Sequence, residues 1–134
     1  HPGLFSLLHS VKKDKLILIT DCTRAGGLAD GEYTLGGQPI YVNGIECRLA
    51  DGTIAGSVLK LNNAVKNYRD HAKIPMWEAV RAASLHAAMA IGEDQTKGSL
   101  AEGKDADIVL MDNNCTALQT YVRGELKYTK GDNQ

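Results

Sequence analysis

The sequence predicts an α/β fold, and three observations support this class. Apolar residues at helical spacing open the chain, and a polar turn then leads into residues 16–20, a short run of aliphatic and β-branched side chains. Such a run between polar breakers is typical of a strand buried on both faces. The last third of the chain changes to the two-residue alternation of strands. Helix, turn and buried strand form half of a βαβ unit.

The first expected element is a helix. Its apolar residues lie at spacings i, i+3, i+4 and i+7, and they are Leu4, Phe5, Leu7, Leu8 and Val11. Pro2 stands where a proline suits the first helical turn.

A small meander is expected over residues 32–49. The strand-like runs EYTL, PIYV and IECRL are separated by Gly36-Gly37 and by Asn43-Gly44. An Asn-Gly pair is a strong signal for a two-residue hairpin turn.

Two helices and a β module should follow. Periodic apolar residues predict one helix over residues 61–72, and a second helix should begin after Pro75 and end near Gly92. Strands are expected at residues 106–112 and 117–123, with a turn at Gly124 leading into a third. We therefore expect two domains, one at residues 1–98 and one at 99–134.

Composition excludes several function classes. The net charge is −1 and both signs are interspersed, so no basic patch indicates nucleic acid or a membrane surface. The three cysteines are far apart and form no CxxC, which suits reduced thiols in a cytoplasmic protein. No apolar run approaches the roughly 18 residues of a membrane-spanning helix.

Asp21 is the main candidate for chemistry because it directly follows the aliphatic run. A carboxylate at the carboxyl end of a buried parallel strand lies where α/β barrels place their active sites. The alternative is that Asp21 only caps the next loop. Cys22 has no evident His partner, so a thiol packed beneath a site is a better interpretation than a nucleophile. The four histidines form neither HxH nor HExxH.

Several runs, in this order, resemble the N-acetylglucosamine-6-phosphate deacetylases of the amidohydrolase superfamily. They are ITDCTRAGGLADGEYTLGGQPIYV, LADGTIAGSVLKLNNAVKN, EAVRAASLHAAMAIG and KGSLAEGKDADIVLMD. The resemblance covers nearly the whole chain and corresponds to the C-terminal third of that family. It implies a metal-dependent (β/α)₈ TIM barrel joined to a small β-sandwich, with residues 1–98 in the barrel and 99–134 in the sandwich.

The resemblance also implies the site residues. Residues 15–20 would form the last barrel strand, Asp21 would be the catalytic aspartate, and Ile54, Ala55 and Gly56 would contact the substrate. It implies a divalent metal, zinc first and iron or another divalent ion otherwise, with Asp21 as a candidate ligand and the remaining ligands upstream of this chain. The expected partners are N-acetylglucosamine 6-phosphate, the missing N-terminal part and, in the complete protein, a second copy as a homodimer.

These expectations define a reaction and its alternatives. Amide hydrolysis needs a base that takes a proton from water and returns it to the leaving nitrogen, and a carboxylate can do both. This chain, as the C-terminal third of such an enzyme without the upstream metal ligands, should be inactive alone. One alternative is another amidohydrolase that acts on a cyclic amide or an N-acyl sugar, and the other is a non-catalytic module that binds a sugar or a protein.

Overall fold

The computed structural model describes residues 1–132, and the chain divides into two compact units. One unit combines residues 1–18 with the chain from Val65 onward, and the other contains residues 19–64. The expected division at residues 98/99 stays a prediction. Within residues 1–132, no helix is long and apolar enough to cross a membrane.

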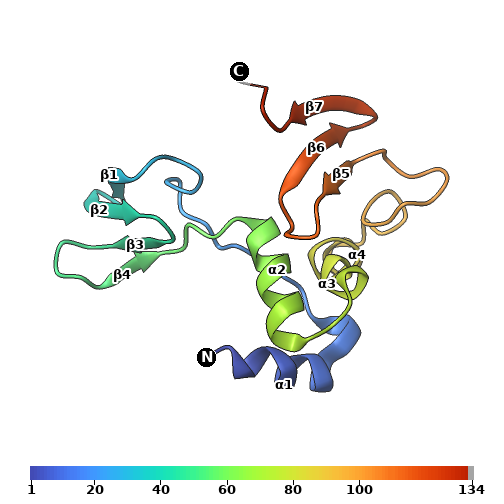
Figure 1. Ribbon diagram of the computed structural model, residues 1–134, viewed down its shortest axis with the longest axis horizontal. Coiled ribbons are helices and arrows are strands. Elements are labelled where there is room, and N and C mark those ends of the chain that lie inside the picture. Colours follow the sequence, from blue (N-terminus) through green and yellow to red (C-terminus); the bar gives the residue numbers. More distant parts are fainter. Residues whose placement is uncertain (133–134) are drawn as a thin grey trace. The chain divides into compact units, whose positions relative to one another are not determined.

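The helices of the first unit follow the apolar spacing of the sequence. They are α1 (Gly3–Lys12), α2 (Leu61–Ala72), α3 (Met76–Ala83) and α4 (Leu85–Ala90), with a 3₁₀ turn, η1, at Lys13–Lys15 (Figure 1). The predicted helices at the start of the chain and at residues 61–72 are confirmed. α1 is held against α2 by the Phe5 ring, which stacks on His71 at 5.4 Å, and by a 2.8 Å hydrogen bond between His9 Nδ1 and Tyr68 Oη.

The single helix predicted from Pro75 to Gly92 is wrong, because the chain breaks it at Ser84. The backbone of Ser84 leaves helical geometry, with φ −132° and ψ −80°, and its Oγ donates to the carbonyl of Val80 at 2.8 Å. Gly98 lies against the break, where an added Cβ would come within 3.0 Å of the Leu85 Cα. A serine hydroxyl that bonds back to the i−4 carbonyl competes with regular helix.

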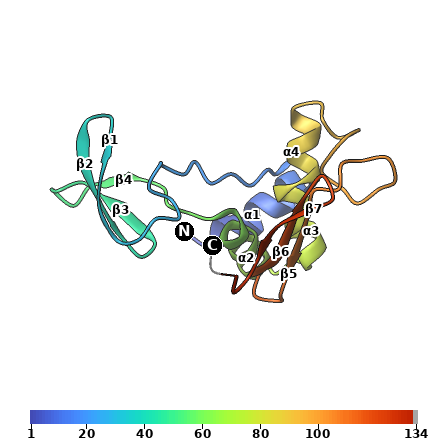
Figure 2. The same ribbon diagram turned by 90° about the horizontal axis from the view of Figure 1, so that it is seen from above.

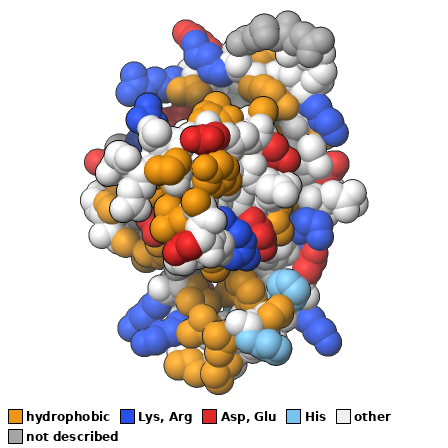
Figure 3. Space-filling model, turned by 90° about the vertical axis from the view of Figure 1, so that its left-hand side faces the viewer, with side chains coloured by type: hydrophobic (Ala, Val, Ile, Leu, Met, Phe, Trp, Pro, Cys, Tyr) orange, Lys and Arg blue, Asp and Glu red, His pale blue; other side chains and the backbone are white. Residues whose placement is uncertain are grey.

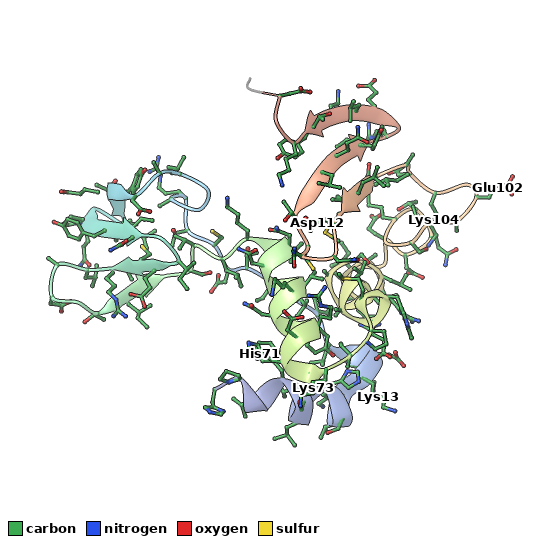
Figure 4. All side chains as sticks on the ribbon, in the orientation of Figure 1. Lys13, His71, Lys73, Glu102, Lys104 and Asp112 are labelled. Carbon is green, nitrogen blue, oxygen red and sulfur yellow. The ribbon has the colours of Figure 1, made fainter. Side chains whose placement is uncertain are left out.

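A three-stranded antiparallel sheet ends the chain, as the sequence predicts. Its strands β5 (Ile108–Met111), β6 (Ala117–Val122) and β7 (Glu125–Thr129) lie in sequence order (Figure 2). Asp112, labelled in Figure 4, forms the turn from β5 to β6 because its Oδ1 accepts from the amides of Asn114 and Thr116, each at 2.8 Å. The hydrogen bond from the Thr116 amide is the largest cause of the lowered pKa of Asp112.

The core of this unit is small and built largely from the helices. Its buried members are Val65, Tyr68, Ala79, Ala82 and Cys115. Leu16 and Leu18 pack against this cluster from the segment that follows η1. Many large apolar side chains of both units are exposed, and Figure 3 shows orange patches on one face of the molecule.

Residues 16–20 are extended but form no strand. The Leu18 amide donates to the Ala82 carbonyl at 2.9 Å, and the Leu16 carbonyl lies 2.8 Å from His86 Nδ1. Ile17 and Ile19 are 39% and 70% exposed. The prediction of a strand buried on both faces is therefore wrong for this chain, because no other described segment runs alongside to pair with it.

The second unit is a four-stranded antiparallel meander (Figure 1). Its strands are β1 (Gly31–Leu35), β2 (Gln38–Asn43), β3 (Glu46–Arg48) and β4 (Ile54–Gly56). Hairpins are present at both predicted places. Leu35 pairs with Gln38 around Gly36-Gly37, but Asn43 pairs with Glu46, so the second turn consists of Gly44 and Ile45 and Asn43 ends β2. The core consists of Ala25, Ile40, Val42 and Cys47.

Candidate active site

Asp21 lies near the start of the second unit. Its carboxylate is exposed, and its backbone has an unusual conformation. Its φ is +47°, in the left-handed region that costs a non-glycine residue on the order of 1 kcal/mol and that Asp tolerates better than most. Within residues 1–132 its side chain makes no hydrogen bond or ion pair, so both carboxylate oxygens are available. Such strain often marks functional sites.

The residues after Asp21 join it to the segment that follows β4. Cys22 forms an isolated parallel bridge with Ser57, and the Thr23 amide donates to the Ser57 carbonyl at 2.8 Å. The next turn closes when the Gly26 amide donates to the Thr23 carbonyl at 3.0 Å. Ala25, within this turn, is fully buried in the core of the unit. The glycine-rich loop is therefore anchored at its start.

The Ile54–Gly56 segment is a bulged strand. Gly56 pairs with Cys47, but Ile54 pairs with Arg48, so Ala55 is the extra residue. Ala55 packs against the core while Ile54 is 71% exposed. Bulges recur beside active sites because they redirect side chains and backbone groups.

The loop that leads into this strand is held by two charged side chains. Arg48 Nη1 donates to the Gly52 carbonyl at 2.7 Å, and Asp51 Oδ1 accepts from the Thr53 amide at 2.9 Å. The Thr53 amide lowers the pKa of the Asp51 carboxyl, and the Arg48 guanidinium does the same for Glu46. The entry to β4 is thereby fixed by groups that remain charged at neutral pH.

The described residues do not form a complete metal centre. A catalytic metal needs three or more converging ligands, and within residues 1–132 no group of three His, Cys, Asp or Glu side chains is suitably placed. Asp21 is the only metal candidate predicted from the sequence, and it does not hold an ion by itself. We therefore derive no chemical step through a metal.

Cys22 and the histidines have structural surroundings. The expectation that Cys22 packs beneath a site is wrong, because it is exposed and its Sγ lies against Gly26. His86 is buried with its Nδ1 at hydrogen-bond distance from the Leu16 carbonyl, and His9 bonds Tyr68.

The structure thus brings the two predicted parts of the site into one unit. Asp21 and the Ile54–Gly56 segment are separated by 32 residues along the chain, yet Cys22 and Thr23, which follow Asp21, pair with Ser57, which follows Gly56. Thr23 was not singled out in the sequence, because its importance comes from Gly56, a residue distant in the chain.

The sequence of this chain is similar to those of known proteins. The sequence profile described as the amidohydrolase family matches residues 8–127. N-acetylglucosamine-6-phosphate deacetylase of Bacillus subtilis is 40% identical over 129 residues, which are 96% of this chain and 33% of that protein. A putative N-acetylgalactosamine-6-phosphate deacetylase of Escherichia coli K12 is 38% identical, over 94% of this chain and 75% of that protein.

A solved structure is also similar to this chain. N-acetylglucosamine-6-phosphate deacetylase from Pasteurella multocida superposes with a TM-score of 0.87 at 34% identity, over 94% of this chain and 33% of that one. The chain spans about a third of the length of the Bacillus subtilis relative. Because the family profile covers most of its residues, the chain belongs to the amidohydrolase family.

Proposed function

We propose that this chain is the C-terminal part of an N-acetylglucosamine-6-phosphate deacetylase, which hydrolyses the N-acetyl amide to glucosamine 6-phosphate and acetate. The observation that carries the proposal is the exposed, strained Asp21 tied through Ser57 to the Ile54–Gly56 segment. The similarity to deacetylases over 96% of the chain supports the same reaction class.

Asp21 acts as the general base and then as the general acid. Its carboxylate takes a proton from the attacking water and hands it to the departing nitrogen, which leaves poorly as an anion. Its place at the start of the anchored Thr23–Gly26 turn gives the group a defined backbone position. The absence of a competing side-chain partner within residues 1–132 leaves both oxygens available for the proton.

Ile54, Ala55 and Gly56 contact the sugar. The bulge at Ala55 interrupts the ladder with β3, which frees backbone groups for a ligand. The glycine-rich loop borders the site, with Ala25 anchoring its start and Asp30 accepting from the Gly44 amide at 2.9 Å near its end.

The remaining parts of the enzyme belong to the longer protein. In this proposal residues 1–98 complete a TIM barrel and residues 99–134 contribute strands to a β-sandwich. The divalent metal, zinc first, is held by residues outside this chain with Asp21 as a further ligand, and the complete protein is a cytoplasmic homodimer. The exposed Ile17 and Ile19 belong to an extended segment that pairs only when the missing strands are present.

A second candidate substrate is N-acetylgalactosamine 6-phosphate. The observation that favours it is the 38% identity to a putative deacetylase of that sugar, close to the 40% identity to the Bacillus subtilis enzyme. The two sugars differ only in the orientation of one hydroxyl group, so both belong in the same assay.

Acetate release by the complete protein tests the proposal. We expect turnover of N-acetylglucosamine 6-phosphate and much less of the sugar without phosphate. Preference for the galacto isomer would reassign the substrate, and turnover of only a cyclic amide would move the protein to another branch of the family. If no substrate releases acetate, the deacetylase proposal fails.

The 134-residue chain, assayed alone, tests the fragment part of the proposal. It should release no acetate. Deacetylation by this chain together with stoichiometric bound zinc would contradict the view that the metal ligands lie elsewhere.

A further inference from the structure

Thr23 packs directly on the predicted substrate segment, and nothing in the proposed reaction has yet used it. We propose that Thr23 is a positioning residue whose methyl group sets the place of the Ile54–Gly56 segment relative to Asp21. This inference rests on the proposed function for its kinetic consequences, although the contact itself stands on geometry.

The methyl contact explains why residue 56 is a glycine. A Cβ added to Gly56 would lie 2.5 Å from the Thr23 Cγ2, a separation that real Cβ atoms do not show. The φ of Gly56 lies outside the left-handed region, so backbone conformation does not require glycine here. Because Thr is branched at Cβ and stiff at χ1, its methyl cannot swing away easily. The Thr23 methyl therefore occupies the space that a Cβ at residue 56 would need, so the two residues fit each other only with glycine at position 56.

Backbone hydrogen bonds fix Thr23 from both sides. Its amide donates to the Ser57 carbonyl, next to Gly56, at 2.8 Å, and its carbonyl accepts from the Gly26 amide at 3.0 Å. Asp21 lies only two residues earlier in the chain. A change in the Thr23–Gly56 contact must consequently shift the substrate segment against the catalytic carboxylate.

The hydroxyl of Thr23 is not the functional atom. Its Oγ1 is buried and has no hydrogen-bond partner within residues 1–132. Replacing an unpaired buried hydroxyl by a methyl of similar shape should be neutral or favourable. The proposal therefore predicts opposite results for two near-isosteric variants, Thr23→Val, which keeps the methyl, and Thr23→Ser, which keeps only the hydroxyl.

Steady-state kinetics of the complete protein with N-acetylglucosamine 6-phosphate test this prediction. Thr23→Val should keep the KM and kcat of the unaltered protein. Thr23→Ser should raise KM severalfold, and Gly56→Ala should raise it roughly tenfold or more, because small displacements of positioning groups are costly. In both variants kcat should fall by a smaller factor than KM rises, since the segment that moves contacts the sugar while Asp21 itself is retained.

A double variant and a control complete the test. Thr23→Ala makes room for the new Cβ, so Thr23→Ala/Gly56→Ala should have a lower KM than Gly56→Ala alone, which is the coupling expected of two residues in contact. The same Thr→Val and Thr→Ser changes at Thr34, an exposed residue on β1, should leave both constants unchanged.

The pattern of variants decides between outcomes. If Thr23→Ser behaves like the unaltered protein and Thr23→Val is impaired, the hydroxyl has the role and the proposal is overturned. A fall in kcat with unchanged KM in Thr23→Ser would also overturn it. If Gly56→Ala does not fold, the Val/Ser pair still decides.

Hydrogen exchange of the complete protein without substrate separates this inference from the deacetylase proposal. The Thr23 amide should be protected in Thr23→Val and should exchange at least several times faster in Gly56→Ala. This result is independent of any substrate. Equal exchange rates in Gly56→Ala and the unaltered protein would show that the contact does not hold the segment, even if the protein proves to be a deacetylase.

Discussion

The two units of this chain use different means to place their residues. In the first unit, helices α1 to α4 bury side chains against one another, and polar side chains lock neighbouring helices, as His9 does with Tyr68. In the second unit, tight turns and backbone hydrogen bonds position most residues, and the core cluster has four buried members. The candidate site lies in the second unit. Substitutions at Thr23 and Gly56 should therefore alter catalysis through backbone position, whereas substitutions of buried residues in either unit should alter stability.

Charged side chains hold loops and helices in both units, and Asp21 differs from them. Lys104, labelled in Figure 4, gathers the loop between α4 and β5 by donating to the Lys97 carbonyl at 3.3 Å and to Ser99 Oγ at 2.8 Å. On α2, Arg69 and Lys66 both bond Asp70 and lower its pKa to about 2. Asp21 is the opposite case, because no described side chain within residues 1–132 engages it.

The largest stability effect should come from the core of the second unit. Ile40→Ala removes a fully buried side chain from a four-residue core and should lower the free energy of unfolding by about 2–5 kcal/mol. Ile45→Ala, at an 89% exposed position between β2 and β3, is the matched control and should have little effect. Denaturant unfolding measures both. Equal losses in the two variants would show that the second unit has no core of its own.

A smaller effect should come from overfilling the first unit. Ala82→Leu inserts three carbons at a position that is 1% exposed and should cost about 1–3 kcal/mol. Ala90→Leu, at the exposed end of α4, controls for the change in helix propensity. Amide exchange should report the loss in the first unit and leave the Thr23 amide protected. Loss of Thr23 protection in Ala82→Leu would abolish the distinction between the units.

The smallest effect should come from Tyr68→Phe, which removes the hydrogen bond to His9 and should cost about 0.5–1.5 kcal/mol. Burial and the nearby Glu78 carboxylate raise the pKa of Tyr68. Its contribution is therefore fully present below pH 10, where the unfolded phenol titrates, and is lost as pH rises through the higher folded pKa. Unfolding measured across alkaline pH should show a shallower decline in Tyr68→Phe, and an identical decline would remove Tyr68 from the explanation.

Much of the fold could be predicted because the signals are local. Apolar spacing predicts α1 and α2, and the Asn43-Gly44 pair predicts the turn between β2 and β3. The break at Ser84 could not be predicted, since it depends on the contact of Gly98 with the following turn. Residues 16–20 have a strand composition, but pairing depends on neighbouring strands and not on composition.

Part of the candidate site could likewise be predicted from the sequence, and part could not. Asp21 is identified by its position after an aliphatic run, and Ile54–Gly56 by resemblance to a family. The contact between Thr23 and Gly56 has no local signature, because it arises where distant segments meet beside Ser57.

The turnover of Asp21→Asn in the complete protein tests the central claim most directly. Asn keeps the size of the side chain but cannot carry the proton, so kcat for N-acetylglucosamine 6-phosphate should fall by about 10²–10⁴-fold while the protein remains folded. Near-normal turnover in a folded Asp21→Asn protein would show that another group moves the proton and would contradict the account.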